Sequence, residues 1–148
     1  MIKFVEKETP EITYPVGRKC KGDDGLVVIF WSEELGTAIY GGRYGVEDGL
    51  TVENWVSCQN YDVWQPCDIE ITEEQRILDY GPAKGKIAYP IAKRDRKDGY
   101  IVLFIDDNKG IVAANNPDAG YTKCLGWVDC FGDINDPKWE PVDLKIYG

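Results

Sequence analysis

Two apolar runs of six residues dominate the pattern of hydrophobic and polar positions along the chain. Residues 26–31 read Leu-Val-Val-Ile-Phe-Trp, and residues 100–105 read Tyr-Ile-Val-Leu-Phe-Ile. Each run follows an Asp-Gly pair and precedes a polar segment that ends in glycine. β-Branched and aromatic residues between turn signals are typical of strands, and unbroken apolarity indicates a strand covered on both faces. We therefore expect two central strands, each lying between the core of its own unit and the other unit.

Shorter segments around the two runs predict partner strands. These segments are 12–20, 37–41 and 68–71 around the first run, and 86–94, 111–115 and 142–146 around the second. The last segment of each set alternates apolar and charged residues, as a half-buried strand does. The pattern predicts one antiparallel sheet of three or four strands around each run.

The two halves are related by an internal repeat, in which residues 14–71 match residues 89–146. The matched features are a Tyr-Pro pair, the apolar run, a turn glycine, a Trp-Val-x-Cys motif and a Trp-x-Pro-x-Asp closing strand. A unit of about 58 residues can barely bury a core alone. We therefore expect an all-β, mainly antiparallel fold in which two tandem, pseudo-symmetric β-sheet or SH3-like barrel units pack together.

The segment between the two units carries the helix signal. Thr72 and Gln75 form a capping box around two glutamates, and a Gly-Pro pair follows at residues 81–82. This pattern predicts one short helix at 73–80. The expected organisation is a first β unit at 1–71, a helical connector at 72–85 and a second β unit at 86–148.

Composition narrows the classes of function. The 148 residues include 17 Lys and Arg, 26 Asp and Glu and no His, which gives a net charge of −9. Without His, the commonest general base, the Ser-His and Cys-His nucleophile pairs and all His-containing metal sites are excluded. We expect a protein that is not an enzyme and that uses no cofactor or metal ion. The acidic balance also disfavours direct binding to nucleic acid or to an anionic membrane.

The five cysteines are interpreted as packing residues. They include no C-x-x-C pair, and no signal-peptide core or membrane span is apparent, so we expect reduced thiols and a cytoplasmic protein. The repeat matches Cys58 with Cys130, Cys67 with Val142 and Cys124 with Val52. A position that accepts Val is an apolar packing position, because Cys behaves as a small hydrophobic residue.

The aromatic residues divide into matched and unmatched positions. Five tryptophans could form a stacking platform for sugars or bases. Four of them are matched by the repeat and are interpreted as packing residues, namely Trp55, Trp64, Trp127 and Trp139. Three tyrosines outside the matched positions are better candidates for surface contacts, namely Tyr40, Tyr44 and Tyr61.

Charge is unevenly distributed along the chain. The equivalent segments 18–21 and 93–97 hold seven of the 17 basic residues, whereas acids are dense at 47–53, 62–79 and 129–143. Acidic surface often serves only solvation. The alternative is a negative face that docks onto a basic groove, with Asp and Glu in place of phosphates, as in nucleic-acid mimics.

The order of these motifs resembles that of small accessory proteins encoded by tailed bacteriophages. The likeness lies in the Asp-Gly hairpin, the Val/Ile/Phe strand, the glycine-containing turn, the Trp-Val-x-Cys motif and the Trp-x-Pro-x-Asp-Ile closing strand. The resemblance implies a phage protein that interferes with a host system such as CRISPR or restriction, by binding rather than by catalysis.

Our leading hypothesis is a non-enzymatic inhibitor in the bacterial cytoplasm. It would bind a host defence or nucleic-acid-processing protein, without direct contact to nucleic acid or membrane, through an acidic, Tyr-rich face. The candidate contact residues are Tyr40, Arg43, Tyr44, Glu47, Asp48, Glu53, Tyr61 and Asp62. The alternative hypothesis is a sponge that holds a nucleotide signal or a sugar in an aromatic pocket between the two units.

Overall fold

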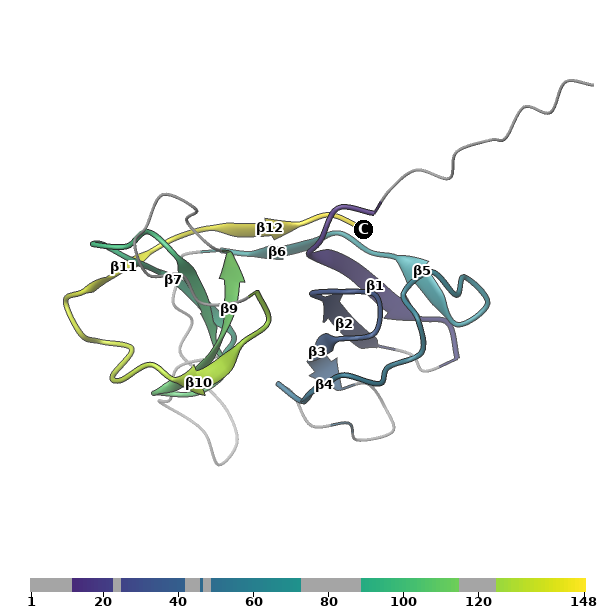
Figure 1. Ribbon diagram of the computed structural model, residues 1–148, viewed down its shortest axis with the longest axis horizontal. Helices are drawn as coiled ribbons and strands as arrows, with labels where there is room; N and C mark the ends of the chain where they lie inside the picture. Colours follow the sequence, from purple (N-terminus) through teal and green to yellow (C-terminus); the bar gives the residue numbers. More distant parts are fainter. Residues whose placement is uncertain (1–11, 23–24, 42–45, 47–48, 73–88, 115–124) are drawn as a thin grey trace, which may run out of the picture.

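The computed structural model describes residues 12–22, 25–41, 46, 49–72, 89–114 and 125–148 (Figure 1). This described part contains strands and no helix. The strands are β1 Val16–Cys20, β2 Leu26–Phe30, β3 Gly36–Gly41, β4 Thr51–Val52, β5 Trp64–Pro66, β6 Ile69–Ile71, β7 Ile91–Asp95, β8 Ile101–Phe104, β9 Lys109–Ala114, β10 Val128–Cys130, β11 Trp139–Pro141 and β12 Leu144–Ile146. The helix expected at 73–80 lies outside the described residues.

Two antiparallel sheets share one topology, which confirms the internal repeat. Their strand orders are β4-β3-β2-β1-β5 and β10-β9-β8-β7-β11. The register shifts after Val27 in the first sheet and after Ile101, its equivalent, in the second. Each sheet has five strands rather than three or four, because the short segments β4 and β5, and β10 and β11, also join it.

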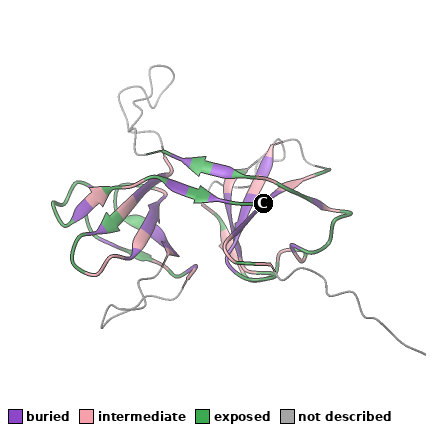
Figure 2. Ribbon diagram, turned by 90° about the horizontal axis from the view of Figure 1, so that it is seen from above, coloured by how far each residue is buried: buried purple, intermediate pink, exposed green. Residues whose placement is uncertain are grey.

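The closing strands β6 and β12 form a separate two-stranded sheet across the tops of both units (Figures 1 and 2). Their antiparallel register pairs Ile69 with Ile146, Glu70 with Lys145 and Ile71 with Leu144. We expected each closing strand to join the sheet of its own unit, and that expectation was wrong. An alternating pattern identifies the buried face of a strand but does not identify the edge with which it pairs.

Each unit has a core of its own. Val28 and Phe30 of β2 face the core of the first unit, and Val102 and Phe104 of β8 face that of the second. A buried tryptophan packs edge-to-face on the phenylalanine in both, with ring centroids 5.3 Å apart in the first unit and 5.2 Å apart in the second.

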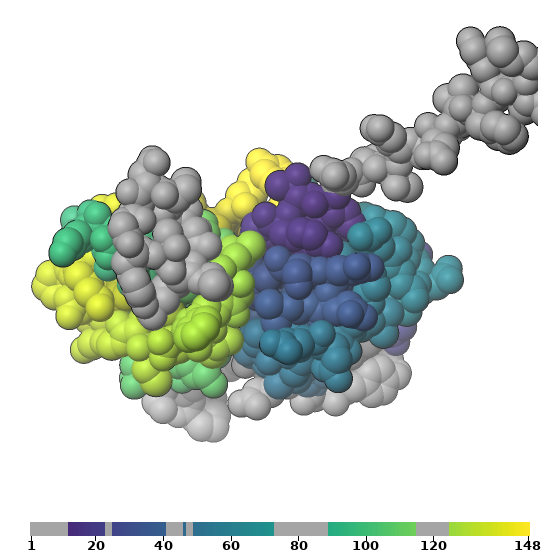
Figure 3. Space-filling view, in the orientation of Figure 1, coloured from purple at the N-terminus to yellow at the C-terminus, as the bar shows by residue number. Residues whose placement is uncertain are grey.

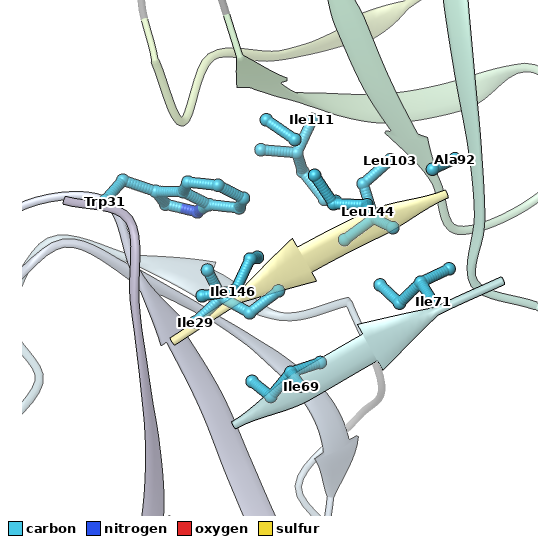
Figure 4. Close-up of a cluster of buried hydrophobic side chains, with 10 residues drawn as sticks. Ile29, Trp31, Ile69, Ile71, Ala92, Leu103, Ile111, Leu144 and Ile146 are labelled. Atoms are coloured by element: carbon cyan, nitrogen blue, oxygen red, sulfur yellow. The ribbon is translucent and has the colours of Figure 1, made fainter. Parts of the chain in front are cut away.

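A third core lies between the units and is shared by both (Figure 4). Its buried members are Ile29, Trp31, Ile69, Ile71, Ala92, Leu103, Ile111, Ala113, Leu144 and Ile146. Neighbours along β2 and β8 alternate between the two kinds of core, as Val28 and Ile29 do. The expectation that both faces of the central strands are covered is therefore confirmed, and the other unit covers the second face.

Candidate partner-binding surface

Backbone hydrogen bonds beside β4 and β10 show which residues of the two units are equivalent near Trp127. The amide of Ala38, in β3, donates to the carbonyl of Leu50 at 2.9 Å. At the same place in β9, the amide of Val112 donates to the carbonyl of Trp127, also at 2.9 Å. Trp127 therefore occupies the position of Leu50, and not that of Trp55.

The true equivalent of Trp55 is Phe131. The amide of Trp55 donates to the carbonyl of the β2–β3 turn, and the amide of Phe131 donates to that of the β8–β9 turn. The ring of Trp55 lies 6.2 Å from that of Trp64, and the ring of Phe131 lies 6.3 Å from that of Trp139. The shared Trp-Val-x-Cys motif is thus not a structural match.

This alignment of the two units decides which of the four matched tryptophans are packing residues. Trp64 and Trp139 are buried, as the repeat predicts, and Trp55 is half-buried. Trp127 is 50% exposed, so the prediction that it is a packing residue was wrong. The two copies of the motif match in sequence but do not occupy equivalent positions in space.

The cysteines follow the same correction. Cys58 is fully buried in the first core, whereas Cys130 is exposed on β10. Ile134 takes the place of Cys58 in the second unit, because their amides donate to equivalent turn carbonyls. The match of Cys67 with Val142 holds, since both are half-buried beside the closing strands.

A pocket of about 390 Å³ lies where the two units meet. It is lined by Leu35, Thr51, Glu53, Leu125, Gly126, Trp127 and Val128. The first three come from the first unit and the other four from the second. We call this the junction pocket. Figure 3 shows the seam between the two units, where residues just beyond 125 meet residues of the first unit.

Close packing behind the junction pocket requires glycine. Gly126 has φ +81°, and a Cβ atom there would come within 2.8 Å of the Trp31 indole. Its equivalent Gly49 has φ +87°, and a Cβ atom there would come within 2.7 Å of Ile105, the equivalent of Trp31. These reciprocal contacts mean that the units pack about a pseudo-two-fold axis.

A chain of polar contacts fixes the Thr51 side of the pocket. The Trp31 indole N–H donates to the Thr37 hydroxyl at 2.8 Å, and the hydroxyls of Thr37 and Thr51 lie 2.7 Å apart. The Thr51 hydroxyl also donates to the carbonyl of Gly49 at 3.2 Å. These bonds satisfy the buried hydroxyl of Thr37 and hold the wall of the pocket in one conformation.

The predicted contact residues that are described lie in three places. Glu53 lines the junction pocket, Tyr40 is exposed on β3, and Tyr61 and Asp62 are exposed in the loop before β5. Four more lie outside the described residues, as does Cys124: Arg43, Tyr44, Glu47 and Asp48. Of the described contact residues, only Glu53 lines a pocket that also contains an exposed tryptophan.

Tyr61 has cationic neighbours. The Arg18 guanidinium lies 5.5 Å from the centroid of its ring and 3.4 Å from its hydroxyl. Arg18 itself is buried and donates to the carbonyls of Cys58 and Gly17, at 2.9 and 3.0 Å. Lys21 donates to the Tyr61 carbonyl. The predicted acidic, Tyr-rich face is therefore locally basic at this tyrosine.

Exposed acids gather at the turn that follows each central strand. The β2–β3 turn carries Glu33 and Glu34, and the β8–β9 turn carries Asp106 and Asp107. A loop of the same unit packs on each turn through backbone hydrogen bonds and adds further exposed acids, namely Glu53 and Asp62 in the first unit and Asp133 and Asp136 in the second. We call these turns and loops the acidic ends.

Two equivalent tyrosines have raised pKa values. Burial, followed by the hydrogen bond with Cys58, raises the pKa of Tyr14 to about 12. The pKa of Tyr89 is also raised. Burial is the main cause, and the second cause is the hydrogen bond that Tyr89 donates to Asp107 at 2.7 Å. Both phenols are therefore protonated at neutral pH and are not available as general bases there.

Within the described residues, no group of three or more Cys, Asp or Glu side chains is arranged to hold a metal ion. The same part of the chain contains no helix long and apolar enough to cross a lipid bilayer. Comparison of the chain with protein-family models, with curated proteins and with solved structures finds no match.

Proposed function

We propose that this protein is a non-enzymatic inhibitor of the bacteriophage anti-defence kind. In this role it binds a bacterial defence or nucleic-acid-processing protein in the host cytoplasm and blocks the basic groove of that protein. The observation that carries the proposal is the placement of exposed acids at the acidic ends of both units.

The arrangement of charge favours protein binding over a purely solvating role. The acids lie on tight turns and on loops bonded to those turns, as in the hydrogen bond of 2.9 Å from the Ser57 hydroxyl to Glu33. Fixed carboxylates lose little conformational entropy when a partner binds. Much of the basic charge lies elsewhere, on β1 and on β7 with the turn that follows it, where Arg94 and Arg96 are paired with Glu140 at 2.7 and 3.7 Å.

A protein of this kind acts by occupancy and performs no chemistry on its partner. Carboxylates spaced along two rigid units stand in for the phosphates of a nucleic-acid backbone. Long-range attraction accelerates association with a basic groove, and this attraction weakens as salt is added.

Affinity capture from bacterial lysates tests the proposal. The bait is the full chain, compared with the charge-neutralised variant Glu34→Gln/Glu53→Gln/Asp62→Asn. The matched control, Lys19→Gln/Lys93→Gln/Lys97→Gln, removes three positive charges from β1, from β7 and from the turn that follows β7. We expect the bait and its control to retain one defence or nucleic-acid-processing protein, and the neutralised variant to lose it. Recovery of no such protein from strains that carry CRISPR and restriction systems would contradict the proposal.

The junction pocket supports a second candidate function, a sponge for a nucleotide signal or a sugar. Its volume of about 390 Å³ is within the range of small-molecule sites, and Trp127 offers an aromatic surface. A thermal-shift screen against cyclic nucleotides and sugars separates the two functions. Stabilisation that depends on ligand concentration favours the sponge, and the absence of any shift favours the inhibitor.

A further inference from the structure

The lining of the junction pocket combines three kinds of group. Leu35, Leu125 and Val128 are apolar, Trp127 is aromatic, and Glu53 is an exposed carboxylate. None of the described residues that line this pocket is basic. This described lining therefore offers an anionic ligand a carboxylate and no cation.

The indole of Trp127 stands beside a second carboxylate. Its N–H lies 3.4 Å from Oδ2 of Asp129, and half of the side chain is exposed. The faces of an indole ring attract cations because of the ring quadrupole, and neighbouring carboxylates add to that attraction. The indole of Trp127 is thus flanked by two acids, Asp129 of its own unit and Glu53 of the first unit.

We propose that the junction pocket binds one guanidinium group, the side chain of an arginine on the partner protein. The planar group stacks on Trp127 and is paired with Glu53, while its methylene stem lies on the apolar lining. Arginine fits better than lysine, because a guanidinium stacks on an aromatic face and bonds a carboxylate with fixed geometry. This inference rests on the proposed function and names the anchor by which a basic partner is held.

The other half of the molecule lacks this combination. At the positions equivalent to Trp127 and Asp129 stand Leu50 and Val52. A separate pocket of about 150 Å³ is lined by Ile39, Gly49, Tyr89, Pro90 and Ile105, and this described lining includes neither a tryptophan nor a carboxylate. Because the two halves share one fold, the difference assigns the guanidinium site to one side only.

Titration of the full, ¹⁵N-labelled chain with N-acetyl-arginine amide tests the inference without any partner protein. The isosteric and uncharged N-acetyl-citrulline amide is the control ligand. We expect the arginine probe to shift the indole N–H signal of Trp127 and the amide signals of residues 125–128, and the citrulline probe to leave them in place. Equal shifts with both ligands, or no shift with arginine, would overturn the inference.

Three variants locate the site, each checked by its thermal melt. Glu53→Gln removes the carboxylate, and Trp127→Leu installs the residue of the other half; each should weaken binding of the arginine probe roughly two- to fivefold, as expected for one exposed ionic or cation–π contact. Asp68→Asn, which changes an exposed acid of the same unit outside the acidic ends, should leave the affinity unchanged. Equal weakening by Asp68→Asn and Glu53→Gln would indicate general charge attraction and overturn the site.

The two proposals fail in different experiments. If the arginine probe binds but lysates yield no protein, the inhibitor function is wrong and the guanidinium site stands. If a partner is captured but its affinity is indifferent to Glu53→Gln and Trp127→Leu, the partner docks elsewhere and the site is wrong.

Discussion

Trp64 and Trp139 occupy equivalent positions but differ in one hydrogen bond. The indole N–H of Trp64 donates to the carbonyl of Val56 at 3.0 Å, whereas that of Trp139 is buried without a hydrogen-bond partner among the described residues. Both rings contribute similar packing to the two cores. The difference between the two sites therefore isolates the contribution of one polar group.

Replacement of each tryptophan by phenylalanine measures that contribution. Trp64→Phe loses packing and a hydrogen bond, while Trp139→Phe loses packing and removes a buried, unsatisfied donor. We expect Trp64→Phe to lower the free energy of unfolding by about 1 kcal/mol more than Trp139→Phe does. Urea denaturation of both variants checks the difference. An equal loss would mean that Trp139 has a partner of equal value.

Gly126 and Gly132 offer a second matched comparison. Both have positive φ, +81° and +77°, but a Cβ atom at Gly132 would meet nothing within 4 Å, whereas one at Gly126 would collide with Trp31. Gly132→Ala should lower the free energy of unfolding by about 1–2 kcal/mol, because alanine is strained in the left-handed backbone conformation. Gly126→Ala should cost more, because the units must also move apart. Thermal melts that rank Gly126→Ala as the milder change would contradict the packing described at this contact.

The sequence predicts buried residues better than it predicts the site. The apolar runs identify the core residues of β2 and β8, because burial on both faces leaves an unbroken pattern. Trp127 was missed because the Trp-Val-x-Cys motif suggested a false match. A comparison that starts from the two glycines, Gly49 and Gly126, aligns Leu50 with Trp127 and reveals the exposed tryptophan.

At the scale of elements, the pairing of β6 with β12 joins the two units. Glu70 and Lys145 are equivalent residues of the repeat and pair with each other at the centre of this ladder, with Nζ and Oε1 3.4 Å apart. A strictly symmetric pair of units would have two like charges there. The divergence of the repeat has replaced that repulsion with an ion pair. Electrostatic attraction to Tyr147, followed by the hydrogen bond with Glu70, raises the pKa of Lys145.

A charge swap tests the role of this pair. Glu70→Lys places two cations together and should lower the melting temperature, and the double variant Glu70→Lys/Lys145→Glu should restore it. The effect should be small and should shrink in high salt, because both side chains are largely exposed. The pKa of Lys145 is raised in the folded state, so its ion pair stabilises the fold at neutral pH. This stabilisation is lost as the pH rises through the folded-state pKa of Lys145. A double variant as unstable as Glu70→Lys would contradict the pairing.

Strand positions could be predicted from the sequence, but strand partners could not. The alternation in β6 and β12 correctly identifies Ile69, Ile71, Leu144 and Ile146 as inward-facing residues. Nothing in a period of two distinguishes a pairing within one unit from a pairing between units. The short strands β4 and β10 carry too few residues for any period to be recognised.

At the scale of the whole molecule, the shared core makes the two units mutually dependent. It takes residues from the central strands of both sheets and from β6 and β12. Neither unit can cover the second face of its central strand alone, and about 60 residues bury too little surface for ample stability. The two units of the repeat therefore share one core, which each of them needs to cover its central strand.

This dependence predicts that damage in one unit is felt in the other. Leu103 of β8 is fully buried in the shared core, and Leu103→Ala should lower the free energy of unfolding by about 2–5 kcal/mol. If the units unfold together, hydrogen exchange of the amides in β2 and in β8 should report the same loss, and calorimetry should record one transition. Retention of full protection in β2, or two separate transitions, would mean that the units fold independently. In that case the shared core, which also supports Trp31 behind the junction pocket, would not hold the two walls of the pocket in a fixed relation.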